Sequence, residues 1–287
     1  MAITQRETTQ VEDANASGRT PVVFIHGLWL LPSSWDNWAR FFDQAGYAPI
    51  TPSWPDDPET VEEARANPDV FAKKNLAQIA DHTAEVIGRL NQKPAVMGHS
   101  TGGLLTFMIA DRGLSAVSVA IDPGPFRGVL PLPISALKSA GPVLKNPLNR
   151  GRAVTLTLEQ FKYGWANALT DEEAQSLYET YHVAAPGVAL MQMANANLNP
   201  FTEATVDPKN PDRGPLLILD GEKDHTVPWA IANAAYNRQK HNAAVTEIEQ
   251  IPNRGHSLTI DHGWRDVADK ALTFVQRFVA PQRPQDN

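Results

Sequence analysis

The stretch "VMGHSTGGLL", residues 96–105, places one serine, Ser100, between glycines at the junction of two apolar runs. Residues 98–102 read G-H-S-T-G and fit the pattern G-x-S-x-G, which forms a sharp turn from a strand into a helix. Small residues at both ends let strand and helix approach closely while the serine adopts a strained backbone. The pattern predicts a nucleophilic Ser100. A glycine-rich phosphate loop is the alternative, but its Lys-Ser/Thr pair is absent.

A serine hydroxyl needs a base and a group that orients the base. The stretch "DGEKDHTVPW" (220–229) supplies Asp224, and "PNRGHSLTIDHGW" (252–264) supplies His256, each directly after an apolar run. Serine, acid and histidine in this chain order match the arrangement expected for a G-x-S-x-G enzyme. We expect His256 to be the base and Asp224 the acid. Asp122, which also ends an apolar run, stays open as an alternative acid.

A tetrahedral intermediate carries negative charge on the former carbonyl oxygen, which needs hydrogen-bond donors. The stretch "FIHGLW" (24–29) ends the first strong apolar run with a turn. The backbone N–H groups of Leu28 and Thr101 are the predicted oxyanion donors, and His26 and Gly27 shape the first of the two loops. Trp29 and His99 are the candidate substrate-binding residues, although His99 could also serve only in local packing.

Short apolar runs alternate with segments of helical spacing along most of the chain. The predicted strands occupy residues 21–27, 47–54, 94–100, 116–122, 215–221 and 245–252. Such alternation indicates an α/β fold with a mostly parallel central sheet flanked by helices.

One long interval, residues 126–213, lacks a convincing strand and is too long for an ordinary connection. We interpret it as a helical cap inserted into a core formed by residues 21–125 and 214–280. Residues 1–20 are predicted to be a loose N-terminal arm, and residues 281–287 a C-terminal tail. Both are polar and lack periodicity.

Large apolar side chains in the cap predict an apolar roof over the pocket. They are Phe126, Leu130, Leu132, Ile134, Leu137, Phe161, Tyr163, Trp165, Leu190, Met191, Met193 and Leu198. The first half of the cap also carries the cations Arg127, Lys138, Lys145, Arg150 and Arg152. We expect these cations to form a solvated face. The alternative is that one of them points inward and pairs with a substrate carboxylate.

Composition narrows the functional classes. The net charge of −7 and the absence of long basic runs argue against nucleic-acid binding. The chain has no cysteine, which excludes thiol nucleophiles and thiolate metal sites. It has no leader-like start and no apolar run long enough to span a bilayer. We therefore expect a cytoplasmic protein without a membrane partner.

The motifs "HGLW", "GHSTGG", "GEKDHTVP" and "RGHS" together resemble the α/β-hydrolase superfamily across about residues 20–280. The resemblance implies Ser100 as nucleophile, Asp224 as acid, His256 as base, Leu28 and Thr101 as oxyanion donors, and 126–213 as the cap. Relatives that open epoxides or displace halide carry aspartate at this position. Ser100 therefore argues against both of these reactions. The strand hairpin that usually opens the family's sheet hardly fits into the polar residues 1–20. We therefore expect a smaller sheet of six or seven strands.

The function expected from these residues is hydrolysis of carboxylic esters or lactones of medium-sized hydrophobic compounds through an acyl-enzyme, without metal or organic cofactor. The partner is then a small hydrophobic substrate, and the sequence leaves the oligomeric state open. Peptidase and thioesterase activities are the nearest alternatives among hydrolases, and two alternatives of other classes also remain at this point. One is a slow-turnover ligand-binding receptor of the same fold, and the other is a lyase or perhydrolase that uses the same triad.

Overall fold

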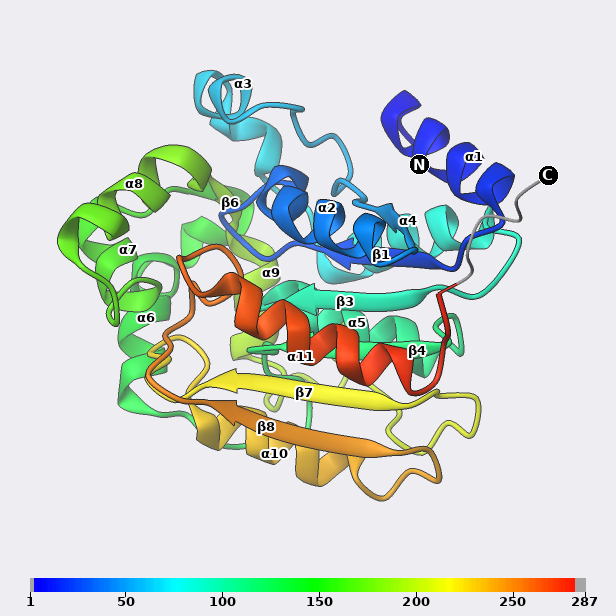
Figure 1. The fold of residues 1–287 in the computed structure, drawn as a ribbon. Helices are drawn as coiled ribbons and strands as arrows, with labels where there is room; N and C mark the ends of the chain where they lie inside the picture. The colour runs from blue at the N-terminus through cyan, green and yellow to red at the C-terminus, as the bar shows by residue number, and fades with distance from the viewer. Residues whose placement is uncertain (1–2, 282–287) are drawn as a thin grey trace.

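The computed structural model describes residues 3–281 of the chain. Its centre is a six-stranded sheet in which all neighbouring strands are parallel, in the order β2-β1-β3-β4-β7-β8 (Figure 1). The strands are β1 (Pro21–Ile25), β2 (Ala48–Ile50), β3 (Ala95–His99), β4 (Val117–Ile121), β7 (Leu216–Gly221) and β8 (Thr246–Ile251). The mostly parallel α/β fold predicted from the sequence is confirmed, and each of the six predicted strand regions contains one of these strands.

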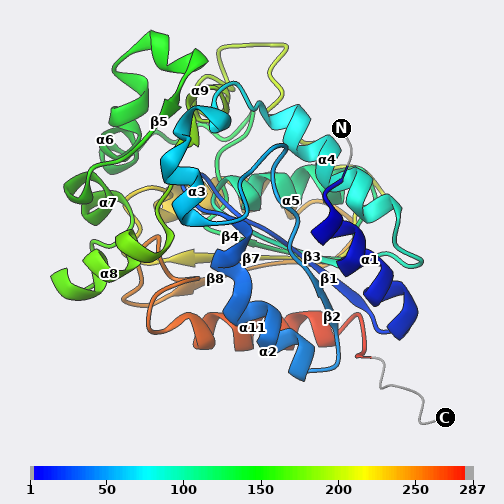
Figure 2. The same cartoon turned by 90° about the horizontal axis from the view of Figure 1, so that it is seen from above.

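Helices cover both faces of the sheet, as Figure 2 shows along its edge. Successive strand side chains point to opposite faces. Val22 and Phe24 therefore pack with α2 (Asp36–Gln44) and α11 (Trp264–Gln276), whereas Val23 and Ile25 belong to the core on the other side. That second face is covered by α1 (Gln5–Ser17), α4 (Leu76–Gly88), α5 (Thr101–Asp111) and α10 (Trp229–Gln239). Burial on both faces explains why the strands read as continuous apolar runs.

Residues between β4 and β7 form the helices α6 (Ile134–Leu144), α7 (Leu158–Gly164), α8 (Asp171–Tyr181) and α9 (Gly187–Ala194). A two-residue antiparallel pair joins β5 (Ala153–Val154) to β6 (Ala185–Pro186). Figure 1 shows α6, α7 and α8 grouped beside the carboxyl ends of the strands, where ligands bind in open α/β sheets. A short helix α3 (Val61–Ala66) and the 3-10 turns η1 (Pro32–Trp35), η2 (Pro68–Phe71) and η3 (Pro147–Gly151) complete the described elements.

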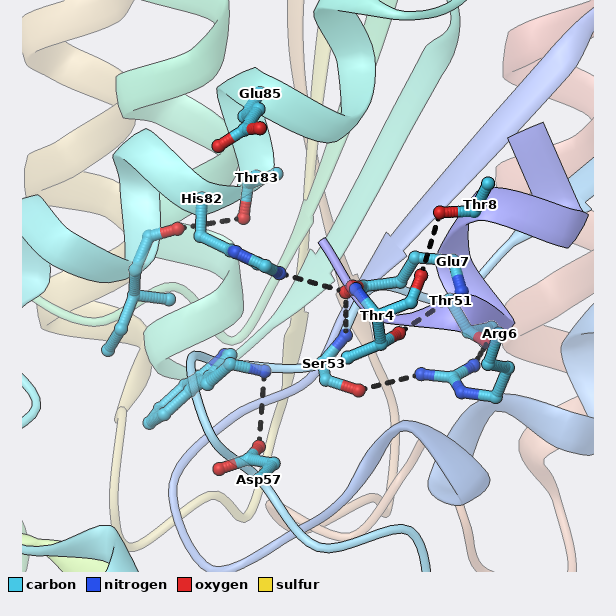
Figure 3. A network of polar contacts seen from close by, with 12 residues as sticks. Thr4, Arg6, Glu7, Thr8, Thr51, Ser53, Asp57, His82, Thr83 and Glu85 are labelled. Atoms are coloured by element: carbon cyan, nitrogen blue, oxygen red, sulfur yellow. Dashed lines mark hydrogen bonds and ion pairs between the residues drawn. The ribbon is translucent and has the colours of Figure 1, made fainter. Parts of the chain in front are cut away.

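The prediction of a loose N-terminal arm is wrong for residues 5–17, which form α1. The helix begins with a capping box between Thr4 and Glu7. The Glu7 carboxylate is fully buried, accepts a hydrogen bond from His82 Nε2 at 2.9 Å and another from Ser53 N at 2.9 Å (Figure 3). Arg6 donates to Ser53 Oγ at 2.7 Å. Polar contacts rather than an apolar stripe hold α1 to the core, which is why hydrophobic periodicity did not reveal it.

In the predicted C-terminal tail, residues 282–287 lie outside the described residues. No helix within residues 3–281 combines the length and apolar character that crossing a membrane would require.

Candidate active site

Ser100 occupies the turn between β3 and α5 with φ 58° and ψ −118°. A non-glycine residue with positive φ outside the left-handed helical basin is strained, and such strain needs support from its surroundings. The support comes from glycines: a Cβ on Gly98 would collide with the Gly102 carbonyl, and one on Gly102 would collide with the backbone of Ile25. The G-x-S-x-G spacing is therefore a packing requirement of this turn.

His256 lies in the loop after β8 and is fully buried. Its Nε2 is 2.9 Å from Ser100 Oγ, and its Nδ1 is 2.6 Å from Asp224 Oδ2. In the tautomer that satisfies both contacts, Nδ1 donates to the carboxylate and Nε2 accepts from the hydroxyl. The structure thus brings Ser100, His256 and Asp224 together in one chain of hydrogen bonds.

The Asp224 carboxylate is fixed by its own loop after β7. Its Oδ1 accepts hydrogen bonds from Thr226 N at 2.6 Å and Val227 N at 2.9 Å, while Oδ2 faces His256. The Thr226 hydroxyl donates to Gly164 O at 2.8 Å and lies 2.7 Å from Ser139 Oγ on α6. These contacts connect the acid loop to α6 and α7. Sequence reasoning missed Thr226. Aspartate often accepts a hydrogen bond from the backbone N–H two residues later, in an Asx turn, and this habit could have pointed to Thr226.

Asp122, the alternative acid, ends β4 beside the same histidine but does not hydrogen-bond to it. Its Oδ2 is 3.7 Å from His256 Nδ1, and its Oδ1 accepts from Gly221 N at 2.8 Å. Complete burial, followed by repulsion from Asp224 and Asp220, raises the pKa of Asp122 well above its ordinary value. Burial, followed by the charge of Asp224, also raises the pKa of Asp220, to about 9. Of the three carboxyl groups, Asp224 is the one within hydrogen-bond distance of His256 Nδ1.

His99 is not a pocket residue, contrary to the prediction that it binds substrate. It is 1% exposed and lies behind His256, with 4.6 Å between the ring centroids and 5.4 Å to Trp165. Burial, followed by the charge of His256, lowers the pKa of His99 well below its ordinary value. A neutral His99 therefore packs against the back of the His256 ring.

The turn after β1 lies against the nucleophile. A Cβ on Gly27 would be only 2.9 Å from Ser100 Cβ, so glycine is needed for this approach. His26 Nδ1 lies 2.9 Å from Gly27 O and can donate to it. Leu28 and Thr101 both line the space next to Ser100, and Thr101 is the first residue of α5, where backbone N–H groups have no partner within the helix. Both predicted oxyanion donors are thus beside the serine.

A pocket of about 660 Å³, including its open mouth, begins at Ser100. Its walls are largely apolar. The apolar side chains that line it are Leu28, Trp29, Leu132, Ala136, Leu137, Ala140, Leu144, Leu190, Met193, Val227 and Ile231. Trp29 is placed here as predicted, with φ 63° and its Nε1 donating to Val154 O at 2.9 Å. Among the residues described, no charged side chain lines the pocket. The alternative of an inward-pointing cation is therefore wrong.

Two groups of side chains have the chemistry of metal ligands: His99, Asp122 and His256, and Asp122, Asp220 and Asp224. Both groups share members with the Ser100–His256–Asp224 chain. The two ring nitrogens of His256 already contact Asp224 and Ser100, and the pKa values of Asp122 and Asp220 are raised. This arrangement favours proton transfer at His256 over coordination of a metal ion.

The sequence matches the family described as "Alpha/beta hydrolase family" over residues 22–270. The match covers most of the chain, and the protein belongs to this family. No curated protein matches the sequence.

Solved structures share the fold at low sequence identity. A monoacylglycerol lipase from Paleococcus ferrophilus has a TM-score of 0.62 and 18% identity, with 90% of this chain and 94% of that chain covered. A thermophilic esterase from Thermogutta terrifontis has a TM-score of 0.64 and 17% identity, with 91% of each chain covered. A methylesterase from Arabidopsis has a TM-score of 0.62 and 14% identity, with 90% and 99% covered.

Proposed function

We propose that this α/β hydrolase cleaves carboxylic esters or lactones of medium-sized hydrophobic compounds through an acyl-enzyme on Ser100. The observation that supports it most strongly is the unbroken chain from Ser100 Oγ to His256, 2.9 Å, and from His256 to Asp224, 2.6 Å. The pocket beside Ser100 has the apolar walls and few polar groups that suit a small hydrophobic ligand.

In the first half-reaction, Ser100 Oγ attacks the carbonyl carbon while His256 Nε2 takes the hydroxyl proton. The N–H groups of Leu28 and Thr101 bind the oxyanion of the tetrahedral intermediate. As the intermediate collapses, the bond to the alkoxy group breaks and His256 returns the proton to the departing alcohol. Asp224 holds the imidazole in the required tautomer and stabilises its charged form.

In the second half-reaction, His256 takes a proton from a water molecule, whose oxygen attacks the acyl carbon. The collapse of this second intermediate releases the acid and returns the proton to Ser100. In a lactone, acid and alcohol leave as one molecule after this step.

A series of activated esters with acyl chains from acetyl to octanoyl tests the proposal. We expect kcat/KM to increase from acetyl through the medium chain lengths by up to about fourfold for each methylene that the pocket buries. Ser100→Ala, the control, should lower turnover at least ~10³-fold. A preference for acetyl over all longer chains would contradict the apolar substrate class, and unchanged turnover in Ser100→Ala would contradict the mechanism.

A further inference from the structure

One stretch of the chain, residues 127–152 before and around α6, exposes an unusual number of large apolar side chains. Leu130 is 72% exposed, Ile134 85% and Leu148 65%, with Leu132 and Leu137 also exposed. We call this stretch the 127–152 surface. Isolated exposed leucines are normal, but several within one short segment mark a binding surface.

The charge of the 127–152 surface is opposite to that of the whole protein. The chain carries a net charge of −7, yet this stretch contains Arg127, Lys138, Lys145, Arg150 and Arg152 and no Asp or Glu. The first carboxylate that follows, Glu159, lies in a groove with Lys138 and Lys145. Cations interleaved with exposed apolar residues are typical of segments that bind at an anionic lipid interface.

The helix α6 places both kinds of side chain on the same side. At roughly 100° per residue in an α-helix, Ile134, Lys138 and Lys145 fall on one side. Val143 falls on the opposite side and is 1% exposed. A Cβ on Gly141 would be 3.5 Å from Lys145 Cε, so the lysine stem lies over the glycine on the exposed side. Lys138 is exposed, and its Nζ is 3.9 Å from the centroid of the Tyr163 ring.

The same surface is continuous with the mouth of the pocket. Leu132 is 61% exposed and Leu137 47% exposed, and both also line the pocket that begins at Ser100. Anything seated on the 127–152 surface therefore meets the pocket opening directly.

We propose that the 127–152 surface docks onto an anionic lipid bilayer, with Leu130 and Ile134 inserted among the lipids and Lys138 and Lys145 at the headgroups. Lipid is favoured over a protein partner because lysine is depleted in protein interfaces. An extension of the proposal rests on the proposed function: esters dissolved in the bilayer enter the pocket between Leu132 and Leu137. The proposal departs from the expectation, stated from the sequence, of no membrane partner.

Vesicle flotation tests docking separately from catalysis. Ser100→Ala protein, which cannot degrade the lipid, is mixed with vesicles of phosphatidylcholine alone or of phosphatidylcholine with phosphatidylglycerol. We expect binding to the anionic vesicles that weakens as salt increases. Changing Lys138 and Lys145 together to Glu should lower the partition coefficient by at least about tenfold, and changing Leu130 and Ile134 together to Ser should lower it by a similar factor.

Matched controls come from exposed residues outside the surface. Lys93→Glu makes at one exposed site the same charge change that the double variant makes at each of its two lysines. Val245→Ser removes an exposed apolar side chain before β8, and neither control should alter vesicle binding. Equal partition of all variants, or no binding to anionic vesicles, would overturn the proposal. Self-association of the protein that the Leu130/Ile134 variant abolishes, without vesicle binding, would also overturn it by identifying a second copy as the occupant.

Hydrolysis of a water-soluble ester distinguishes the failure of this inference from the failure of the proposed function. Turnover of the soluble ester by wild-type protein without vesicle binding would refute only the docking surface. Vesicle binding without turnover of any ester would support docking and refute the ester hydrolase.

Discussion

Two carboxylates, Asp224 and Asp122, lie next to His256 in different states. Asp224 contacts His256 Nδ1 at 2.6 Å, whereas the pKa of Asp122 is raised by burial and by its acidic neighbours. Asp224→Asn should therefore lower kcat by about 10³ to 10⁴-fold, since an amide favours the wrong imidazole tautomer. Asp122→Asn, the matched control, alters a side chain that makes no hydrogen bond to His256 and keeps an oxygen for Gly221 N. We expect its kcat to stay within about tenfold of wild type.

Steady-state kinetics with a short soluble ester measures both variants, and urea unfolding checks that each is folded. The opposite pattern, a large loss in Asp122→Asn and a small one in Asp224→Asn, would assign the acid to the end of β4. The sequence left this choice open, since both aspartates follow apolar runs. The three-dimensional course of the loops brings both to the histidine, but only Asp224 within hydrogen-bond distance of Nδ1.

At the scale of elements, the docking of α1 onto the core depends on the buried carboxylate of Glu7. Burial raises the pKa of Glu7, but hydrogen bonds from His82 and Thr4 and the charge of His82 outweigh it and lower the pKa to about 2. A lowered pKa means that the charged form stabilises the folded state at neutral pH. This stabilisation is full above the ordinary pKa of 4.5 and is lost as the pH falls from there towards 2.

Glu7→Gln should therefore lower the free energy of unfolding by about 1–3 kcal/mol at neutral pH, and the difference from wild type should shrink between pH 4.5 and 2. Urea unfolding at several pH values measures it. Glu12→Gln, an exposed position on the same helix, is the control and should have little effect. A Glu7→Gln deficit that stays constant down to pH 2 would show that the lost charge is not the cause.

The strands and the helix α1 show what sequence patterns reveal about elements. The strands were predictable because burial on both faces demands continuous apolar residues, as in residues 21–25. The helix α1 was not, because Val11 and Ala14 are its only buried apolar residues among those described. Its docking through Glu7 and His82 joins positions 75 residues apart, a contact without a local signal.

At the scale of the whole molecule, the family and the surroundings of Ser100 followed from local motifs, whereas the shape of the pocket did not. The turn after β1, the serine turn and the histidine loop each carry glycine next to the residue concerned, so their patterns are visible in the sequence. The pocket walls come from residues as distant as Leu28, Leu144 and Ile231, which only the packing of α6 and α9 against the core brings together. The size of substrate that the pocket can accept therefore depends on the tertiary structure.

In the proposed mechanism, Ser100 is the nucleophile and His256 activates it. The most direct measurement is labelling of the native protein by a fluorophosphonate, followed by intact mass and peptide mapping. We predict one adduct, on Ser100, that Ser100→Ala abolishes and that His256→Ala slows at least ~10³-fold. Ser139→Ala, the control for the other serine that lines the pocket, should label like wild type. Folded wild-type protein that stays unlabelled, or that is labelled at another serine, would contradict the account.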